Sequence, residues 1–578
     1  MKNNTLIRIF RYVRERKGLL FISIIFTIIS VTTNLMGPIL IGKSIDNMAG
    51  KGNVNFKEVF NIIIILAVVY VCSSVFNWLL SYLLNLISYK TINSIREDLF
   101  NKINSLPLKF YDSNSHGNII SRFINDIDAI GDGLLQGMSS LFIGVVTIIG
   151  AIAFMLSINL IMTLVVIMSA PITFFVARFV TKNSKKMFMK QAKTLGELNG
   201  YAEEIIKGQK VVKAFNYEKH SYNKFKEINE ELYKSGVKSQ FYGSLANPST
   251  RLVNNITYSL IGIIGSCVAI IGKITVGDIS SFLIYSTLFS KPFNEITGVL
   301  TQIQGAIASA KRIFEIIDIE EEKEDVKHLV NFQEYKGHIT FNNVSFSYDL
   351  QNPLIRNLNL DIKPGSKVAI VGKTGAGKTT LVNLLMRFYE VNNGEICVDG
   401  VNIKHINRDD LRKNFGMVLQ DTFLFSDTIA NNIAYGNLKA SKEEIIKAAK
   451  EADVHSFIRR LSKGYDTEVT SSGDNLSQGQ KQLLTIARVM LENPPMLILD
   501  EATSNIDTRT EIHIQKAFER IMKGRTTFII AHRLSTIKEA DIILVMDNGD
   551  IVESGTHEEL IRKEGYYSIL YNSQFREA

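Results

Sequence analysis

Long uncharged runs of apolar residues follow one another between residues 19 and 300 of the chain. They are long enough to cross a bilayer, because a membrane-spanning helix needs about 20 mainly apolar residues. The runs predict six spans, at approximately residues 19–42, 59–88, 133–156, 160–181, 252–272 and 278–300. Beyond Gly337 no run approaches this length. The pattern therefore predicts a transmembrane domain over 1–316, a polar linker over 317–336 and a domain outside the bilayer over 337–578.

Two of these spans have features of their own. The stretch 133–177 is uncharged and too long for one helix, and polar Ser157 and Asn159 predict that it breaks into a tight helical hairpin. The sixth span is interrupted by Lys291 and Glu295. Ionisable groups in a span are costly and often face a pathway, but residues four apart also suit an ion pair near the inner interface. The sequence leaves both interpretations open.

The connections on one side of the membrane are long and charged. Residues 89–132 and 181–247 carry helical patterns, so we expect the adjoining spans to continue out of the bilayer. Twenty further helical residues would reach about 30 Å. An even number of spans puts both termini on one side, and the basic residues of the N-terminus and of 182–190 make that side the cytoplasm. We therefore expect a multi-pass protein of the cell membrane.

The net charge of +8, from 65 basic and 57 acidic residues, first suggests a nucleic-acid partner. The placement of the charges argues against this, because basic residues such as Arg8 and Arg11 flank the apolar runs, as membrane topology requires. We expect the lipid bilayer and no nucleic acid among the partners. The three cysteines, Cys72, Cys267 and Cys397, are too few and too scattered for a disulfide framework or a zinc site.

The most informative segment is a glycine-rich loop between an apolar strand, 367–371, and a helical stretch, 381–388. It matches G-x-x-x-x-G-K-[ST] in the strand, loop and helix setting that this pattern requires. In such a loop backbone N–H groups turn toward phosphate oxygens, the lysine reaches the β- and γ-phosphates, and the hydroxyl binds Mg²⁺. The predicted nucleotide-binding residues are Gly372, Lys373, Thr374, Gly375, Ala376, Gly377, Lys378, Thr379 and Thr380.

Two further segments suit the same chemistry. The apolar strand 496–500 ends in adjacent carboxylates, of which Asp500 suits Mg²⁺ and Glu501 suits the activation of water. Between the two nucleotide motifs, a helix with an apolar face begins with Ser477, Gln478, Gly479 and Gln480. Taken alone, Ser477 predicts an ordinary helix N-cap.

Together these segments resemble the motifs of ATP-binding cassette proteins, and residues 106–112 are similar to the first cytoplasmic loop of six-span exporters of that family. The resemblance implies an all-α six-helix transmembrane domain followed by an α/β P-loop ATPase that uses ATP and Mg²⁺. It also implies residue roles: adenine stacking by Tyr348, a link between Mg²⁺ and transporter contacts at Gln420, a dimer-interface loop ending in Asp507, and a switch function for His532.

The resemblance implies a partner chain as well. In that family the signature serine of one nucleotide domain touches the γ-phosphate bound to another, so a chain with one set of motifs is a half-transporter. Two positions depart from the usual pattern: Gln478 replaces a glycine and Ser471 replaces a glutamate. Both would act on the partner's nucleotide, whereas Glu501 and His532 are intact. The asymmetry resembles the catalytically complete subunit of bacterial heterodimeric exporters and favours a heterodimer, with a homodimer still open.

The implied function is ATP-driven export of a small hydrophobic or amphipathic compound, multidrug or lipid-like, by alternating access. Short helices around 113–117 and 215–218 would transmit closure of the nucleotide domains, and Lys378, Glu501 and His532 would carry out hydrolysis. The six spans exclude a soluble nucleotide-driven clamp. An ATP-gated channel or regulator, or a peptide exporter built on the same scaffold, stays open. The transported compound is not specified by the sequence.

Overall fold

A computed structural model describes residues 5–48, 54–322, 335–349, 352–373, 375–420, 422–470, 475–500, 507–530 and 537–575. Contacts divide the chain into two compact units. The first, which we call the helical unit, comprises residues 1–106 and 114–320, and the second, the sheet unit, comprises residues 107–113 and 321–578.

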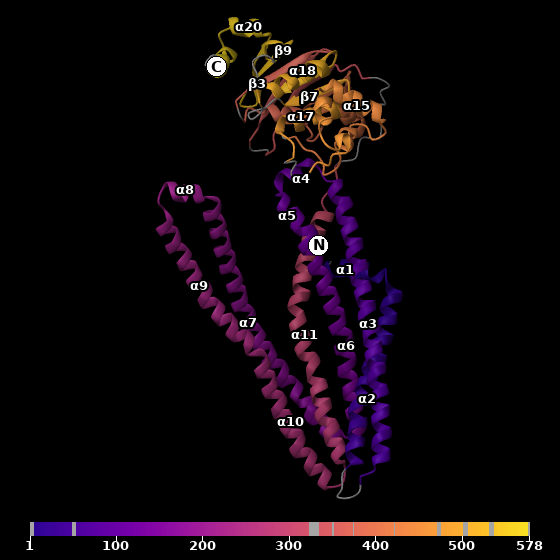
Figure 1. Cartoon of the computed structure of the whole chain (residues 1–578). Coiled ribbons are helices and arrows are strands. Elements are labelled where there is room, and N and C mark those ends of the chain that lie inside the picture. Colours follow the sequence, from indigo (N-terminus) through magenta and orange to yellow (C-terminus); the bar gives the residue numbers. More distant parts are fainter. Residues whose placement is uncertain are drawn as a thin grey trace. The chain divides into compact units, whose positions relative to one another are not determined.

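The helical unit is built from long helices (Figure 1). Their bounds are α1 (Thr5–Arg14), α2 (Lys17–Asp46), α3 (Phe56–Asn104), α5 (His116–Ser121), α6 (Ile127–Ile158), α7 (Leu160–Lys207), α8 (Gln209–Ala214), α9 (Glu218–Ser244), α10 (Ala246–Ile270) and α11 (Val276–Ile317). A π-helical turn, η1 (Arg122–Asp126), joins α5 to α6. With 49 residues, α3 continues well beyond the apolar run that predicts the second span.

A single residue, Asn159, separates α6 from α7. Its backbone is extended (φ −158°, ψ 128°), and its side-chain oxygen accepts hydrogen bonds from the N–H groups of Ile161 (2.9 Å) and Met162 (3.2 Å). This is an N-cap, which satisfies donors that the first turn of a helix leaves without intrahelical partners. The helix break predicted in the uncharged stretch therefore falls at the residue that caps the next helix.

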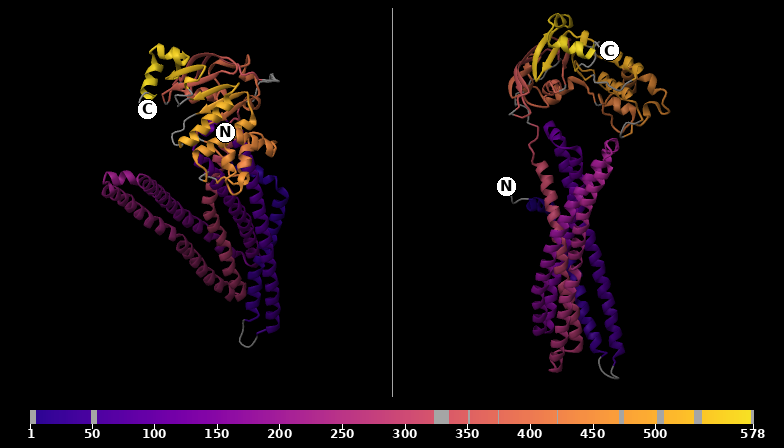
Figure 2. Two further views of the ribbon diagram at one scale, coloured as in Figure 1. Left: turned by 45° about the horizontal axis from the view of Figure 1, so that its top comes forward. Right: turned by 90° about the vertical axis from the view of Figure 1, so that its left-hand side faces the viewer.

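The helices α7 and α9 run side by side, are joined by α8, and diverge from α6 and α11 of the same unit (Figures 1 and 2). Two short helices meet the predicted position around 113–117: α4 (Leu108–Ser113), which belongs to the sheet unit, and α5. The helix α8 ends just before the position predicted at 215–218. Just beyond α8, Asn216 has a φ of 52°. A left-handed residue interrupts a helix, so residues 215–217 form a turn instead.

An apolar core holds α2, α6, α7, α10 and α11 together. Its buried side chains are Val31, Leu35, Ala151, Met155, Met162, Val166, Ile261, Val268, Ile274, Phe282, Tyr285 and Phe289. The Tyr285 hydroxyl donates to the Leu35 carbonyl oxygen (2.5 Å), which satisfies its polar atom inside the core. Within the described residues, four helical stretches are long and apolar enough to cross a membrane: Lys17–Asp46, Phe56–Asn104, His116–Ile158 and Arg251–Ile270.

The sheet unit contains an antiparallel sheet of order β2-β1-β4-β5 and a second sheet of order β10-β9-β3-β8-β7-β6. The strands are β1 (Ile339–Phe346), β2 (Ile355–Ile362), β3 (Lys367–Gly372), β4 (Asn393–Val398), β5 (Val401–Asn402), β6 (Phe415–Val418), β7 (Met496–Asp500), β8 (Thr526–Ile530), β9 (Ile542–Asp547) and β10 (Asp550–Gly555). From β9 to β6 neighbouring strands are parallel. The strands predicted at 367–371 and 496–500 are confirmed.

The helices of the sheet unit connect and cover these strands. Besides α4, the described α-helices are α12 (Lys378–Leu385), α13 (Arg408–Lys413), α14 (Ile429–Ala434), α15 (Lys442–Glu451), α16 (His455–Ile458), α17 (Gln478–Glu492), α18 (Thr508–Met522), α20 (His557–Arg562) and α21 (Tyr566–Phe575). The sequence places the helix after the glycine-rich loop at 381–388. It ends earlier because Arg387 is left-handed (φ 53°) and its buried guanidinium donates to the carbonyls of Ile403 and Ile406.

Alternate residues of the parallel strands enter two separate cores. In β7, Leu497 and Leu499 belong to one core, and Met496 and Ile498 belong to the other. Strands β3, β8 and β9 divide their residues in the same way. A sheet that is buried on both faces requires nearly continuous apolar strands, so polar residues are confined to the ends of these strands.

Candidate nucleotide site

Parallel strands bring the predicted site residues to one edge of the larger sheet. Strand β3 ends at Gly372, β7 ends at Asp500, and β6 ends shortly before Gln420, while β8 lies between β3 and β7. Ligands of open α/β sheets bind at the carboxyl ends of the strands, so this edge is the candidate site. Two predicted residues, Glu501 and His532, follow β7 and β8 in the sequence and lie outside the described residues.

The loop after β3 has a backbone that glycine adopts most easily. Gly372, Gly375 and Gly377 have φ angles of 155°, 84° and 97°. A Cβ atom on Gly372 would lie only 2.3 Å from the Met546 carbonyl oxygen of β9. The loop leads directly into the N-terminus of α12, where the helix dipole favours anions. Thr374, predicted in this loop, lies outside the described residues.

Lys378 is the first residue of α12 and turns back along the loop. Its Nζ donates to the carbonyl oxygens of Gly372 (2.7 Å) and Lys373 (3.0 Å). Burial lowers the pKa of its ammonium group, and the negative charge of Asp500 opposes this shift. A partly desolvated cation held between the loop and the end of β7 is suited to attract phosphate oxygens.

The oxygen donors at this edge suit a magnesium nucleotide. Mg²⁺ is usually bound through one or two carboxylates together with phosphate oxygens and several waters. Thr379 lies in the first turn of α12, Gln420 is exposed after β6, and Asp500 offers the carboxylate. When bound, Mg²⁺ would supply positive charge against the phosphate oxygens. The assignment of these three ligands stays a prediction.

Tyr348 lies beside the loop, just after β1. Its hydroxyl donates to Thr380 Oγ1 (3.2 Å) in α12. The rings of Phe346 and Tyr389 meet it edge-on, each with a centroid distance of 4.9 Å. Tyr348 as a residue is 46% exposed, so its ring is held by these contacts while part of the side chain stays available. This position suits the predicted stacking on adenine.

The signature segment is held by its own helix. The Ser477 side chain accepts from the Gln480 N–H (3.3 Å), and the Gln480 side chain accepts from the Ser477 N–H (2.9 Å). This capping box confirms that Ser477 is the N-cap of α17. Gly479 is buried, and Gln478 Nε2 donates to Thr422 Oγ1 (3.3 Å). The predicted contact with the nucleotide of another chain stays a prediction.

Asp507 is also an N-cap, because its carboxylate accepts from the Thr510 N–H (2.9 Å) at the start of α18. Of the predicted residues, the structure therefore brings the glycine-rich loop, Tyr348 and Asp500 together. It gives the signature segment and Asp507 local roles at the starts of two helices. Ser471 lies outside the described residues.

The sequence prediction missed a contact of Tyr389. Its hydroxyl donates to the carboxylate of Asp112, in the short helix α4. Burial, together with this bond, raises the pKa of the hydroxyl. Because the Tyr389 ring also packs against Tyr348, one side chain connects α4 to the aromatic group at the nucleotide loop. Residues 106–112 were a recognisable segment, but nothing in the sequence indicates a partner 277 positions away.

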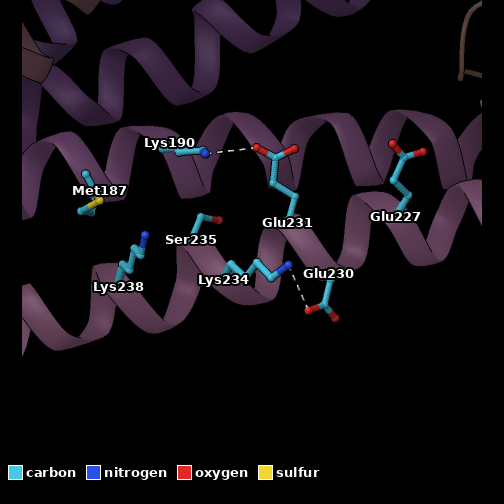
Figure 3. Close-up of a pocket in the computed structure, with 8 residues that line it drawn as sticks. All are labelled: Met187, Lys190, Glu227, Glu230, Glu231, Lys234, Ser235 and Lys238. Carbon is cyan, nitrogen blue, oxygen red and sulfur yellow. Dashed lines mark ion pairs between the residues drawn. The ribbon is translucent and has the colours of Figure 1, made fainter.

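The groove between α7 and α9, in the helical unit, is a different kind of feature (Figure 3). It has a volume of about 530 Å³ and is lined by Met187, Lys190, Glu227, Glu230, Glu231, Lys234, Ser235 and Lys238. Lys190 pairs with Glu231 (3.2 Å), and Lys234 pairs with Glu230 (3.5 Å). Three lysines and three glutamates leave the groove without a net charge that would select a ligand. We therefore interpret the groove as a polar contact between two helices.

Comparisons with known proteins agree with the geometry. The family model of the ABC transporter transmembrane region matches residues 20–293, and the ABC transporter model matches residues 355–504. The chain is 44% identical over 572 residues to an uncharacterized ABC transporter ATP-binding protein of Bacillus subtilis, covering 99% of this chain and 94% of that protein. It is 41% identical over 535 residues to a fatty acid ABC transporter ATP-binding/permease protein of Mycobacterium bovis, covering 92% and 84%. It is also similar to the solved structure of a bacterial Atm1-family ABC exporter with ATP bound, with a TM-score of 0.78 and 30% identity over 97% of this chain and 98% of that chain.

Proposed function

The chain belongs to the ATP-binding cassette exporters, and we propose that it is one half of a dimer that exports a hydrophobic or amphipathic compound by alternating access. As a member of that family it spans the membrane, binds ATP and couples ATP hydrolysis to transport. The observation that carries the proposal is the glycine-rich loop, gathered with Tyr348 and Asp500 at one sheet edge, in a chain with a single set of nucleotide motifs and one transmembrane region.

Hydrolysis would use residues at that edge. Lys378 would exchange the carbonyl oxygens of Gly372 and Lys373 for phosphate oxygens and stabilise the charge that develops on them. Glu501 would polarise the attacking water, and His532 would orient the γ-phosphate. Both termini would lie in the cytoplasm, with the nucleotide, as the basic ends of the predicted spans favour.

We further propose that the partner is a different half-transporter. Support comes from Gln478, which stands where the family usually has glycine and already donates to Thr422 of its own chain. Support also comes from the intact Glu501 and His532. Co-purification with a second half-transporter, and little ATPase activity from this chain alone, would support a heterodimer. Full activity of this chain alone would establish a homodimer.

The lipid-like character of the substrate is supported by the fatty acid transporter among the relatives. The test uses inside-out membrane vesicles and a fluorescent amphiphile. We expect ATP-dependent accumulation against the gradient, abolished by Lys378→Ala. Flux that runs only down the gradient, and that needs ATP binding without hydrolysis, would indicate an ATP-gated channel and overturn the proposal.

A further inference from the structure

The side of α11 that carries Thr287, Lys291 and Glu295 is exposed and polar. Among the described residues beyond Val276, no exposed side chain of this helix is a large hydrophobic one. The exposed polar residues of the predicted sixth span and its continuation include Thr287, Lys291, Glu295, Gln302 and Gln304. Thr287, Lys291 and Glu295 lie four residues apart and so share one side of the helix. We call this side the polar face of α11.

The exposed side of α3 is the opposite case. It presents Phe60, Ile64, Val68, Val71 and Trp78, as a helix does when its neighbours are acyl chains. An ion pair on such a face would be expensive in the bilayer. The polar face of α11 is therefore not expected to meet lipid, although it lies within a predicted span.

The neighbouring helix α10 has three distinct sides. Its buried residues are Val253, Thr257, Ile261, Gly265 and Val268, and its exposed apolar residues include Leu252, Ile256, Leu260, Ile263 and Ile270. The third side is exposed and polar, and it carries Arg251, Asn255, Ser259 and Ser266. Tyr258 is also exposed and lies at the border between the buried and the polar side. At 3.6 residues per turn these sets fall on separate sides of the helix. The helix thus has one side for the core, one suited to lipid, and one suited to water.

The charges on the two polar faces favour an anion. Lys291 and Glu295 form a loose pair (Nζ to Oε1, 3.6 Å), with side chains 69% and 45% exposed. An exposed ion pair contributes little stability, so exchanging Glu295 for another anion costs little. Arg251 adds a second positive charge at the inner end of α10. Counted over the two polar faces, two cations stand against one carboxylate, which is a net positive charge.

We propose that the polar faces of α10 and α11 bind the anionic headgroup, a carboxylate or a phosphate, of an amphiphilic substrate. Lys291 pairs with the headgroup and leaves Glu295, while the apolar chain of the substrate stays in less polar surroundings. This inference rests on the proposed export function, and it makes that function specific for the charge of the substrate.

The experiment uses the complete transporter with its partner chain in nanodiscs of phosphatidylcholine. The readout is the concentration that half-maximally stimulates ATP hydrolysis for three amphiphiles with the same sixteen-carbon chain: a carboxylate, a trimethylammonium and an uncharged maltoside. For the wild type we expect the carboxylate to act at the lowest concentration. Lys291→Gln should raise the half-maximal concentration of the carboxylate about tenfold, because a hydrogen bond to a charged group is lost. The difference in half-maximal concentration between the carboxylate and the maltoside should therefore become smaller. Glu295→Gln should lower the value for the carboxylate.

The matched control is Lys311→Gln. Lys311 pairs with Glu315 on the same helix, at the same spacing and with a similar exposure (3.7 Å, 68% and 57% exposed), but beyond the predicted span. The Lys311→Gln variant should leave the order of the half-maximal concentrations of the three amphiphiles unchanged. An equal effect of Lys291→Gln on all three compounds would mean that this face only contacts the partner chain, and would overturn the inference. Vesicle transport of no amphiphile at all would instead overturn the export function itself.

Discussion

The two units of the molecule differ in how their functional groups are arranged. In the sheet unit the candidate nucleotide-binding groups lie at the carboxyl edge of one sheet, and many of them are backbone groups of the loop that starts at Gly372. In the helical unit the proposed substrate contacts lie along helix faces, as on α11 from Thr287 to Gln302. Nucleotide hydrolysis at the sheet edge depends on single residues, whereas binding along a helix face is shared among several side chains. We therefore expect all-or-none effects at the edge and graded effects elsewhere.

The largest effect is expected from Glu501→Gln. If this residue activates water, its loss should lower steady-state ATP turnover by at least about 100-fold, since a positioned general base contributes this much or more. Release of inorganic phosphate measures the turnover. Glu519→Gln, on the exposed side of α18, is the control and should stay active. Wild-type turnover in Glu501→Gln would contradict the catalytic assignment.

A smaller effect is expected where α4 meets the rest of the sheet unit. Tyr389→Phe keeps the ring but removes the donor to Asp112. Hydrogen bonds to charged groups contribute about 1.5–3 kcal/mol, so we expect coupled transport in vesicles to fall about tenfold. As a control, Tyr465→Phe removes a hydroxyl that bonds His455 elsewhere in the unit. If transport per ATP hydrolysed stayed unchanged in Tyr389→Phe, this contact would have no part in coupling.

Tyr348 tests whether a side chain beside the edge acts by its ring or by its hydroxyl. Removal of the ring in Tyr348→Ala should weaken ATP binding about three- to tenfold, the size of an aromatic stacking contribution. Tyr348→Phe keeps the ring and loses only the hydroxyl, which donates to Thr380 and accepts from Asn383 Nδ2, and it should bind ATP nearly as well as the wild type. Fluorescence titration with a nucleotide analogue measures both. Unchanged affinity in the alanine variant would disprove the stacking role.

The smallest effect is expected at Glu492, the last residue of α17 and remote from the edge. Burial raises its pKa to about 7. A carboxyl group with a raised pKa in the folded state stabilises the fold at low pH, and this stability is lost as the pH rises through 7. Because the group is partly exposed, the loss should be about 1 kcal/mol. Thermal unfolding of Glu492→Gln between pH 5 and 8 should show a smaller decline than the wild type; an identical decline would refute the assignment.

The features that the sequence predicts well have local causes. The apolar strand β3 and the glycine-rich loop are adjacent in the chain, so their residue types report directly on their backbone. The break at Asn159 is equally local, because its side chain caps the helix that follows it. Ser477 is a third case, since its N-cap role needs only the next three residues.

What the sequence does not predict joins residues that are far apart in the chain. Tyr389 bonds Asp112 across 277 positions, and Arg312 Nε donates to Asp126 (2.9 Å) across 186 positions. Neither residue of such a pair carries a signal for the other. The polar faces of α10 and α11 fall between these cases. Their residues are visible in the sequence, but only the burial of the opposite sides shows which residues are exposed.

The single-residue turn at Asn159 has a consequence for how the chain would enter the bilayer during its synthesis, if α6 and α7 both span it as the sequence predicts. A turn of one residue holds no lysine or arginine, so it adds nothing to the charge bias that orients membrane helices. The two helices would then insert as one hairpin, oriented by basic residues that flank the two predicted spans, such as Arg122 and Lys182. A lysine in place of Asn159 would put a positive charge at the turn as well as at the other end of the hairpin. The two charged regions would then favour opposite orientations of the same helices during insertion.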